Sequence, residues 1–377
     1  MSKLRQRISD NLFNIPGWRT KRRIVIFESD DWGSIRMPSR DVYNTLLKAG
    51  IRVDKCPFCS FDSLATEDDL TSLFGVLRKF KDKNGNHPVF TANCVVANPD
   101  FLKILETDFS EYHFELFTET LKRYPGCKNS FSLWKQGINE RLFFPQFHGR
   151  EHVNVNRWMK SLRDKSPEQL LAFQNNMFGI SSTISSEGGK SYMAAFDADN
   201  NIEIESHKHI VNEGLTLFIS TFGFKPTTFV APNFICSEII EKHLASLSFK
   251  FIKSSKVSFL PLIGNGYKKR RLFMGQKNSF GQIYIVRNCL FEPSFFQNTD
   301  WVSSCLRNIK SSFLWDKPAI IGTHRVNYIG SINEKNRKNN LRFLTELLTE
   351  IIKKWPEVEF LNSEQLGALI NSNEKSG

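Results

Sequence analysis

The chain has 377 residues, 40% of them hydrophobic and 24% charged, which is typical of a globular protein with a sizeable core. Its apolar runs are far shorter than the ~20 residues of a membrane span, and the first residues lack the apolar core of a signal peptide. We therefore expect a cytoplasmic protein without a membrane span. Seven cysteines, an odd number, favour free thiols over a disulfide framework.

The charge is strongly basic. The sequence has 51 Lys and Arg against 39 Asp and Glu, a net charge of +12 that favours anionic partners. The two basic clusters, Lys21–Arg23 and Lys268–Arg271, are expected to be solvated surface. No helix-turn-helix, zinc-finger or RNA-binding aromatic motif accompanies them, so a nucleic-acid partner is not expected.

Short β-branched and aromatic runs alternate with longer stretches of helical periodicity, a pattern typical of an α/β protein with parallel strands. The expected strands, about seven, are Ile24–Glu28, Pro88–Val95, Leu142–Phe147, Thr227–Ala231, Phe249–Lys253, Gln282–Asn288 and Ala319–Thr323. A single barrel is the most economical architecture for this order.

Three helices have clear sequence signals. Thr66 and Asp69 match a capping box before an apolar face. Ser166 precedes Pro167, a preorganised helix start. A third helix is predicted over about Arg337–Trp355 and ends before Pro356.

The predicted organisation is a single barrel with additions. Residues 1–20 form an N-terminal helical arm, residues 21–330 the barrel, and residues 331–377 a C-terminal helix that packs on the barrel, with a frayed tail. About residues 154–214 lack the strand–helix rhythm and include the Ser/Gly-rich ISSTISSEGGKS. We interpret them as a loop-rich insertion around a site.

A pair of carboxylates, Asp30 and Asp31, lies just after the end of the first predicted strand. The carboxyl ends of strands are where barrels carry their chemistry. One carboxylate could bind a metal ion while the other acts as a base beside a metal-bound water. The alternative is a solvated Asp-Asp turn.

Two histidines, His148 and His152, follow another predicted strand in LFFPQFHGREHVN. On a helical turn, a separation of four residues places both imidazoles on one side, where they can share a cation. With Asp31 they make a three-ligand site that leaves a position open for water. The alternative is two surface histidines on a loop.

His324 ends the predicted strand of PAIIGTHR. A histidine at that place could act as a general acid near neutral pH. The alternative is a structural, hydrogen-bonded histidine.

Four motifs, ESDDWG, HGREH, the APNF segment around Pro232, and GTHR, follow one another in this order. In this the chain resembles the polysaccharide deacetylase superfamily, the metal-dependent carbohydrate esterases of family four, over about residues 20–330. The resemblance implies a distorted seven-stranded (β/α) barrel. It also implies Asp31, His148 and His152 as ligands of one divalent ion, Asp30 as the catalytic base and His324 as the catalytic acid. Zn²⁺ is the expected ion for such a ligand set, although Co²⁺, Ni²⁺ or Fe²⁺ also fits.

The sequence departs from the family pattern in two places. Val230 stands where the family has an arginine that orients the base. Four arginines are candidates to replace it: Arg36, Arg150, Arg287 and Arg325. The acidic residue and tryptophan that tune the catalytic histidine in the family have only Asp300 and Trp301 as counterparts.

Residues beside the motifs are candidates for binding the substrate. These are Trp32, Arg150, Pro232, Asn233, Arg325 and Tyr328. Trp32, Tyr328 and Trp158 could stack on a sugar ring. Two weaker patterns remain. The C-x-x-C of Cys56 and Cys59 is interpreted as two ordinary thiols. The HKH segment is interpreted as two surface histidines, His207 and His209, on one face of a strand.

These features predict a metal-dependent hydrolase that removes an acetyl group, N-acetyl rather than O-acetyl, from a sugar or glycan precursor. A phosphate-bearing partner would suit the charge of +12. One alternative is a glycoside hydrolase that pairs Asp30 with a second carboxylate such as Glu292. Another is a carbohydrate-binding protein without catalysis, suggested by Val230.

Overall fold

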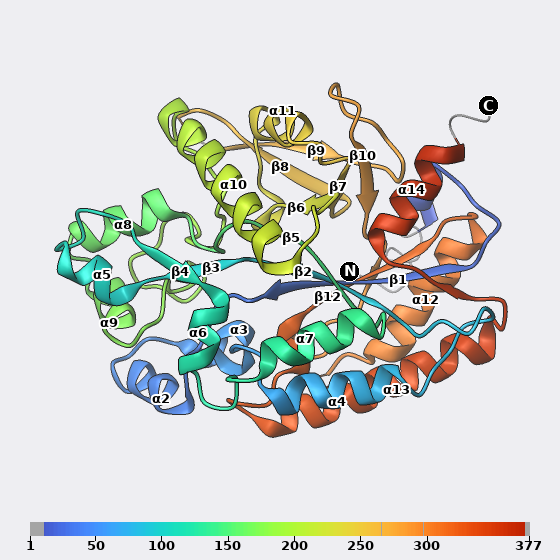
Figure 1. Cartoon of the computed structure of the whole chain (residues 1–377), viewed down its shortest axis with the longest axis horizontal. Coiled ribbons are helices and arrows are strands. Elements are labelled where there is room, and N and C mark those ends of the chain that lie inside the picture. The colour runs from blue at the N-terminus through green and yellow to red at the C-terminus, as the bar shows by residue number, and fades with distance from the viewer. Residues whose placement is uncertain (1–10, 265, 297, 374–377) are drawn as a thin grey trace.

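The structure, a computed structural model, describes residues 11–373 except residues 265 and 297. Residues 1–10 of the predicted N-terminal arm and residues 374–377 of the predicted tail lie outside the described residues. A central sheet crosses the molecule and helices surround it (Figure 1).

The main sheet has nine strands, and all of its pairings are parallel. Its order is β10-β7-β6-β5-β2-β1-β12-β11, and β13 pairs with β1 outside this path. The strands are β1 (Ile24–Trp32), β2 (Phe90–Cys94), β5 (Phe143–Phe147), β6 (Thr228–Val230), β7 (Phe251–Ser254), β10 (Ile283–Val286), β11 (Cys289–Leu290), β12 (Ala319–His324) and β13 (Glu359–Phe360). Each of the seven predicted strands is present in this sheet. The predicted α/β class with parallel strands is therefore confirmed.

The two ends of the strand order are neighbours along the chain. Only Arg287 and Asn288 separate β10, which pairs with β7, from β11, which pairs with β12. The Oδ1 of Asn288 accepts a hydrogen bond from the backbone N–H of Ile320 in β12 at 2.8 Å. One stretch of chain thus joins both edges of the sheet, which is the connectivity expected of a distorted barrel.

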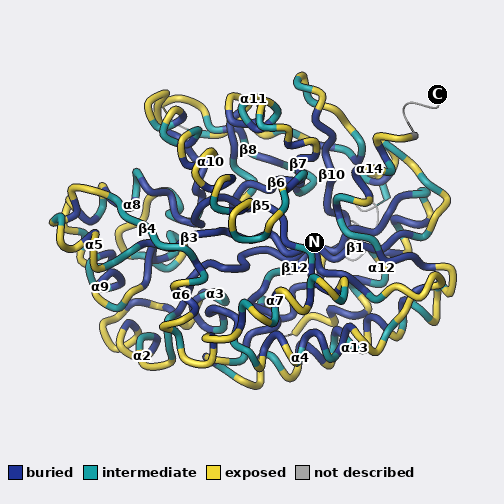
Figure 2. The backbone as a smooth tube through the Cα atoms, in the orientation of Figure 1, coloured by how far each residue is buried: buried dark blue, intermediate teal, exposed yellow. Residues whose placement is uncertain are grey.

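Helices cover the outside of the sheet, with their exposed faces turned outward (Figure 2). They are α2 (Arg40–Lys48), α3 (Pro57–Phe61), α4 (Glu67–Leu77), α5 (Phe101–Glu106), α6 (Phe117–Arg123), α7 (Ser130–Asn139), α8 (Val155–Arg163), α9 (Pro167–Gln174), α10 (Asn201–Phe222), α11 (Glu238–Ser246), α12 (Trp301–Leu314), α13 (Glu334–Lys354) and α14 (Ser363–Asn373). The predicted capping box of α4 and the predicted start of α9 are confirmed. α13 begins three residues earlier than predicted, at Glu334.

The expected insertion, residues 154–214, is more helical than its sequence indicates. It contains α8, α9 and most of α10, whereas residues 175–200 have no helix or strand. The chain after residue 330 also contributes to the sheet, because β13 pairs with β1. The C-terminal segment is thereby built into the barrel itself.

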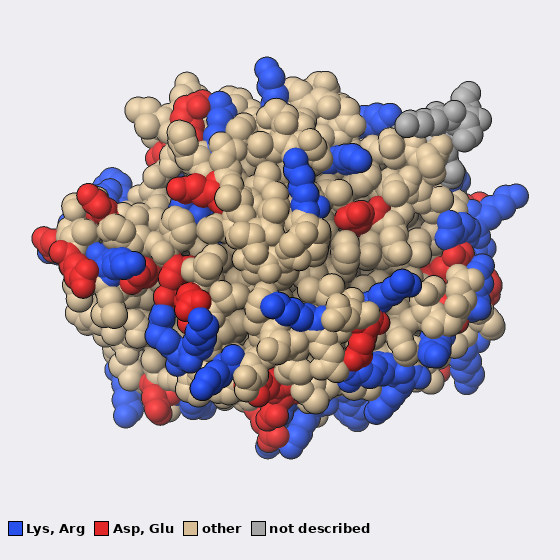
Figure 3. All heavy atoms as spheres, in the orientation of Figure 1, with Lys and Arg blue, Asp and Glu red and all other residues tan. Residues whose placement is uncertain are grey.

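Two short antiparallel pairs lie apart from the main sheet, β3 (Ala97–Pro99) with β4 (Phe114–Leu116) and β8 (Val257–Pro261) with β9 (Tyr267–Arg271). The basic cluster Lys268–Arg271 lies on β9 and is largely exposed. On the face shown in Figure 3, Lys and Arg are scattered among Asp and Glu. No described helix is long and apolar enough to cross a membrane.

Candidate active site

The site begins at an irregular strand end. Consecutive side chains of a regular strand point to opposite faces, so Asp30 and Asp31 would diverge if β1 stayed regular. The pairing of β1 with β2 shifts register between Ser29 and Trp32, and Asp31 has a left-handed φ of 74°. Such a conformation is costly for a residue other than glycine and is often found at functional sites. Both carboxylates consequently line one cavity.

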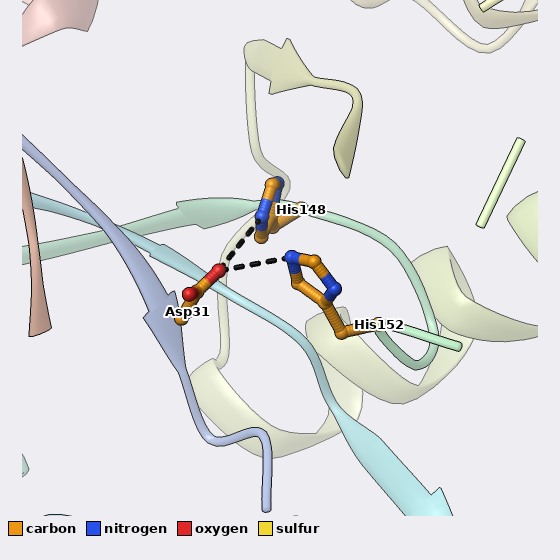
Figure 4. A group of neighbouring side chains, drawn as sticks. All are labelled: Asp31, His148 and His152. Carbon is orange, nitrogen blue, oxygen red and sulfur yellow. Dashed lines mark ion pairs between the residues drawn. The ribbon is translucent and has the colours of Figure 1, made fainter. Parts of the chain in front are cut away.

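Asp31, His148 and His152 converge on each other (Figure 4). Asp31 Oδ1 lies 2.9 Å from His152 Nε2 and 3.6 Å from His148 Nε2. One ligand atom from each residue lies within 4.8 Å of the others, and all three side chains are buried. Two imidazoles and one carboxylate are a donor set that divalent transition metals accept.

The two histidines reach this point from a loop and not from the helical turn that the spacing predicted. Residues 148–152 follow β5 without a helix, and α8 begins only at Val155. Gly149 has a φ of 123°, which only glycine adopts readily. His148 is fixed by a hydrogen bond of 2.7 Å between Nδ1 and the carbonyl of Val230. This leaves Nε2 directed at Asp31, as is usual for a metal-binding histidine.

The protonation states of Asp31 and His152 are those that a bound cation requires. Burial would raise the pKa of Asp31, but Arg36 and the two histidines hold it well below its usual range. Burial lowers the pKa of His152 to about 4, so this imidazole is neutral at pH 7. Among the described residues, the buried Nε2 of His148 has no hydrogen-bond partner. An ionised carboxylate, a neutral imidazole and a buried nitrogen without a partner fit a bound metal ion.

Asp30 has different partners. Arg287 donates two hydrogen bonds to it, at 2.6 and 2.7 Å, and Asn93 Nδ2 donates one at 2.6 Å. Burial opposes ionisation, but Arg287 outweighs it and holds the pKa of Asp30 below its usual range. Asp30 is thus ionised and firmly oriented, with its Oδ2 lying 3.7 Å from His324 Nε2.

His324 is held by an acidic partner. Its Nδ1 donates to Glu292 Oε1 at 2.6 Å, and Asn327 Nδ2 donates to the other oxygen of Glu292 at 2.7 Å. Burial favours the neutral imidazole, but Glu292 outweighs it and raises the pKa of His324 to about 9. His324 therefore carries a proton at neutral pH. The predicted counterparts, Asp300 and Trp301, are elsewhere: Asp300 caps α12, and Trp301 Nε1 donates to the carbonyl of Phe296.

A cavity of about 380 Å³ joins these groups. Asp30, Asp31, His148, His152 and His324 all line it. Of the six residues proposed to bind the substrate, only Asn233 lines it as well. Its backbone is left-handed, with a φ of 57°.

The other five substrate-binding candidates do not line this cavity. Trp32 is packed against Trp134 and Phe143, and its Nε1 donates to Ser29 Oγ. Tyr328 is fully buried and bonds to Thr323. Neither can stack on a sugar, and Trp158 is fully buried as well. Arg150 and Arg325 are buried and do not line the cavity, and Pro232 is buried between the two lining residues Ala231 and Asn233.

Of the four candidate arginines, the structure places Arg287 on Asp30. Arg36 instead bonds to Asp31 Oδ2 at 3.1 Å. Arg325 makes a bidentate pair with Asp62, at 3.0 Å for each bond. Arg150 pairs with Glu151 and Glu213. The sequence could not decide among them, because Arg287 follows β10, which is not adjacent to β1 in the sheet, and reaches Asp30 only through the tertiary fold.

Sequence reasoning also missed a buried polar cluster behind Asp30. Glu28, one of its members, accepts from Asn93 at 2.9 Å and lies 3.3 Å from Lys253 Nζ. Ser363, from the start of α14, also donates to Glu28. A signal was present: Glu28 and Lys253 are charged residues inside predicted buried strands, where an unpaired charge is costly.

The structure also locates the residues of the two weaker sequence patterns. Cys56 and Cys59 are free thiols, as expected, and both line the cavity. His207 and His209 lie on helix α10 and not on a strand, so they do not share a face. His207 is buried and lies against Phe196, whereas His209 is exposed.

No protein-family model and no curated protein matches the sequence. A solved structure assigned to the polysaccharide deacetylases, from Mycobacterium smegmatis, is similar over 95% of this chain and 94% of its own, at 12% identity and a TM-score of 0.46. Solved polysaccharide deacetylases recur among the similar structures.

Other activities occur among the similar structures too. The Puue allantoinase aligns over 93% of this chain and 91% of its own, at 9% identity and a TM-score of 0.45. A 4-alpha-glucanotransferase from Thermococcus litoralis aligns over 91% of this chain but 40% of its own, at 8% identity and a TM-score of 0.43.

Proposed function

We propose that this protein is a metal-dependent hydrolase that removes an acetyl group, N-acetyl rather than O-acetyl, from a sugar or glycan precursor. The observation that carries the proposal is the shared cavity. It places the Asp31–His148–His152 group beside an ionised carboxylate, Asp30, and a protonated imidazole, His324. A metal-dependent hydrolase that cleaves an amide uses these three functions: a cation site, a base and an acid.

Asp31, His148 and His152 would hold the ion, for which Zn²⁺ is our choice. When bound, such an ion supplies Lewis-acid polarisation of an acyl oxygen and lowers the pKa of a water. Asp30, held ionised by Arg287, accepts the proton of the attacking water. His324 Nε2, which points toward the same region, donates a proton to the departing amine. Protonation of the amine is required, because an amide anion is too poor a leaving group at neutral pH.

The glycoside-hydrolase alternative requires a second free carboxylate. Its candidate, Glu292, has both oxygens engaged, one by His324 and one by Asn327. In this arrangement Glu292 orients His324 and stabilises its protonated form. This favours a mechanism in which His324 protonates the leaving group over one in which Glu292 acts directly on the sugar.

The test combines metal analysis with activity. Elemental analysis of the purified protein should find about one divalent ion per chain, and His148→Ala should lose it. The control His209→Ala removes an exposed histidine and should keep it. Acetate release from N-acetylglucosamine and its oligomers should stop on chelation and return with added metal.

Asp30→Asn separates catalysis from metal binding. It should keep the ion, because Asp30 is not in the ligand group, and lose acetate release by about 10²-fold or more. A metal-free protein, or an Asp30→Asn variant of normal rate, would contradict the proposal. Sugar binding without acetate release by the wild type would favour the carbohydrate-binding alternative.

A further inference from the structure

A second, larger cavity adjoins the candidate active site. Its volume is about 1050 Å³, and it shares His324 and Phe234 with the cavity that contains the metal-ligand group. A single sugar ring is much smaller than this, since cavities of 300–1,000 Å³ hold drug-sized molecules. The groove, as we call this larger cavity, therefore has room for a substrate that extends well beyond one ring.

The groove lies on the side of the candidate active site from which the leaving group departs in the proposed mechanism. In the proposed mechanism His324 protonates the leaving amine, so the sugar that bears this amine departs from the His324 side. Arg287, Glu292 and His324 line the groove, whereas Asp31, His148 and His152 line only the smaller cavity. The smaller cavity is thus the place for the acetyl group and the groove the place for the rest of the substrate.

One wall of the groove is a face of α12. Ser304, Arg307, Asn308, Ser311 and Leu314 line it, at the spacing of three and four residues that brings side chains to one side of a helix. Arg307 and Lys310, both exposed, are one turn apart along this wall. Two cations at that spacing can contact one ligand.

The charge of the groove is strongly positive. Lys256, Arg287, Arg307 and Lys310 line it, and Glu292 is the one carboxylate among its described lining residues. Arg287 is neutralised by Asp30, and Glu292 is bonded to His324. Arg307 and Lys310, both exposed, are the cationic side chains of the α12 wall. A cavity lined by charges of one sign attracts ligands of the other.

Apolar side chains accompany these cations. Leu290 is 49% exposed and Leu314 is 71% exposed, and both line the groove. A groove that combines two neighbouring cations, Arg307 and Lys310, with exposed leucines fits a substrate in which an anionic group is attached to carbon-rich parts. Phosphate suits such a site, because its oxygens can accept from more than one cation at once.

We propose that the groove binds a phosphate group carried on the leaving-group side of an acetylated sugar, with Arg307 and Lys310 as its recognition residues. The inference rests on the proposed deacetylase function for its orientation. It goes further by assigning phosphate-bearing sugars as the substrate class.

The test compares neutral and phosphorylated ligands in the metal-loaded, full-length protein. Glucosamine and glucosamine 1-phosphate are suitable, because they are already deacetylated and are not consumed. By titration calorimetry the phosphate should bind at least about tenfold more tightly, given two charge-assisted contacts. Phenyl phosphate, which contains no sugar, should bind as well.

The variant Arg307→Gln/Lys310→Gln should abolish this preference, since it removes both cations from an exposed helix face without disturbing the core. The matched control, Lys242→Gln/Lys353→Gln, removes two exposed positive charges elsewhere and should keep the preference. The preference should also weaken with added salt.

Three results would overturn the proposal: no preference in the wild type, a preference that survives in the groove variant, or an equal loss in the control. Acetate release from N-acetylglucosamine and from its 1-phosphate is measured in parallel. If neither releases acetate but the groove variant still loses phosphate binding, the deacetylase function fails and the phosphate site stands. If both release acetate at equal rates and bind equally, the phosphate site fails and the function stands.

Discussion

At the scale of single residues, two adjacent carboxylates are given different chemistry by their partners. Asp31 faces two imidazoles and one guanidinium, which prepares it to bind a cation. Asp30 accepts hydrogen bonds from Arg287 and Asn93, which keep its carboxylate ionised and oriented. The same residue type thus serves as ligand and as base because of its surroundings.

Arg287 should matter to the rate and not to the metal. In Arg287→Gln, Asp30 loses its bidentate partner, so its pKa rises and its orientation loosens. We expect acetate release to fall by about 10²-fold and the acid limb of the pH–rate profile to move to higher pH. Metal content should be unchanged, because Arg287 contacts none of the three ligands.

Two further variants sharpen this prediction. Arg287→Lys keeps the charge but not the two-pronged geometry and should be intermediate. Arg78→Gln, which breaks an exposed pair with Glu140, should leave the profile unchanged. An Arg287→Gln protein with the wild-type acid limb would show that Asp30 is not the base.

Glu292 should set the alkaline limit of activity. His324 donates a proton in the proposed mechanism, so activity is lost as the pH rises through its pKa of about 9. Glu292→Gln removes the charge that raises this pKa, and the alkaline limb should therefore move to lower pH. The pH dependence of kcat measures this shift. An unmoved alkaline limb would exclude His324 as the titrating acid.

The sequence was informative about residues at strand ends and misleading about their neighbours. Asp30, Asp31, His148, His152 and His324 were selected from motifs, and the structure brings all five to one cavity. Trp32 was selected by adjacency alone, yet the register shift in β1 turns it into the core. Orientation at an irregular strand end depends on the tertiary structure, which sequence periodicity does not contain.

At the scale of elements, charges from strands that are not adjacent in the sheet are buried together. Lys253 on β7 and Glu28 on β1 are both fully buried and lie 3.3 Å apart. Lys253 also donates to Asn93 on β2. These contacts tie three strands together directly behind Asp30.

Lys253→Met should destabilise the protein strongly, because it leaves the Glu28 carboxylate buried without its cation. We expect a loss of about 3–5 kcal/mol in the free energy of unfolding, measured by urea denaturation. Lys253→Met combined with Glu28→Gln should recover part of that loss. Lys242→Met, at an exposed position on α11, should change stability by less than about 0.5 kcal/mol. A Lys253→Met loss as small as this control would contradict the assigned pairing.

Some of the elements that the sequence missed have weak local signals, although the capped amphipathic helices α8 and α12 were missed as well. β11 and β13 have two residues each, too few for a periodic pattern. α10 is a helix of 22 residues, but its start was hidden by the Ser/Gly-rich stretch before it. Strands of four or more residues with a buried pattern, in contrast, were found from sequence.

At the scale of the whole molecule, the C-terminal segment is part of the sheet and of its packing. β13 extends the sheet beside β1, and α14 covers one end of β7 and β10 with the fully buried Leu366 and Ile370. α14 also delivers Ser363 to Glu28. Residues near the end of the chain therefore support the cluster behind Asp30. The sequence predicts that a C-terminal helix packs on the barrel. It does not predict the contact between Ser363 and Glu28, because that contact depends on how the helix is placed in three dimensions.

Because α14 packs closely against the barrel, we expect the substitution Gly367→Ala to destabilise the protein, which is the opposite of the usual effect in a helix. Gly→Ala inside a helix normally stabilises a protein by about 0.5–1 kcal/mol. A Cβ at Gly367, however, would lie 2.7 Å from ring atoms of Phe251, which is itself buried. Gly367→Ala should therefore destabilise by about 1–3 kcal/mol through overpacking. Gly75→Ala in α4, where a Cβ meets nothing within 4 Å, is the matched control and should stabilise. Urea denaturation of both variants measures the two signs, and a stabilised Gly367→Ala protein would show that α14 does not lie against β7 as described.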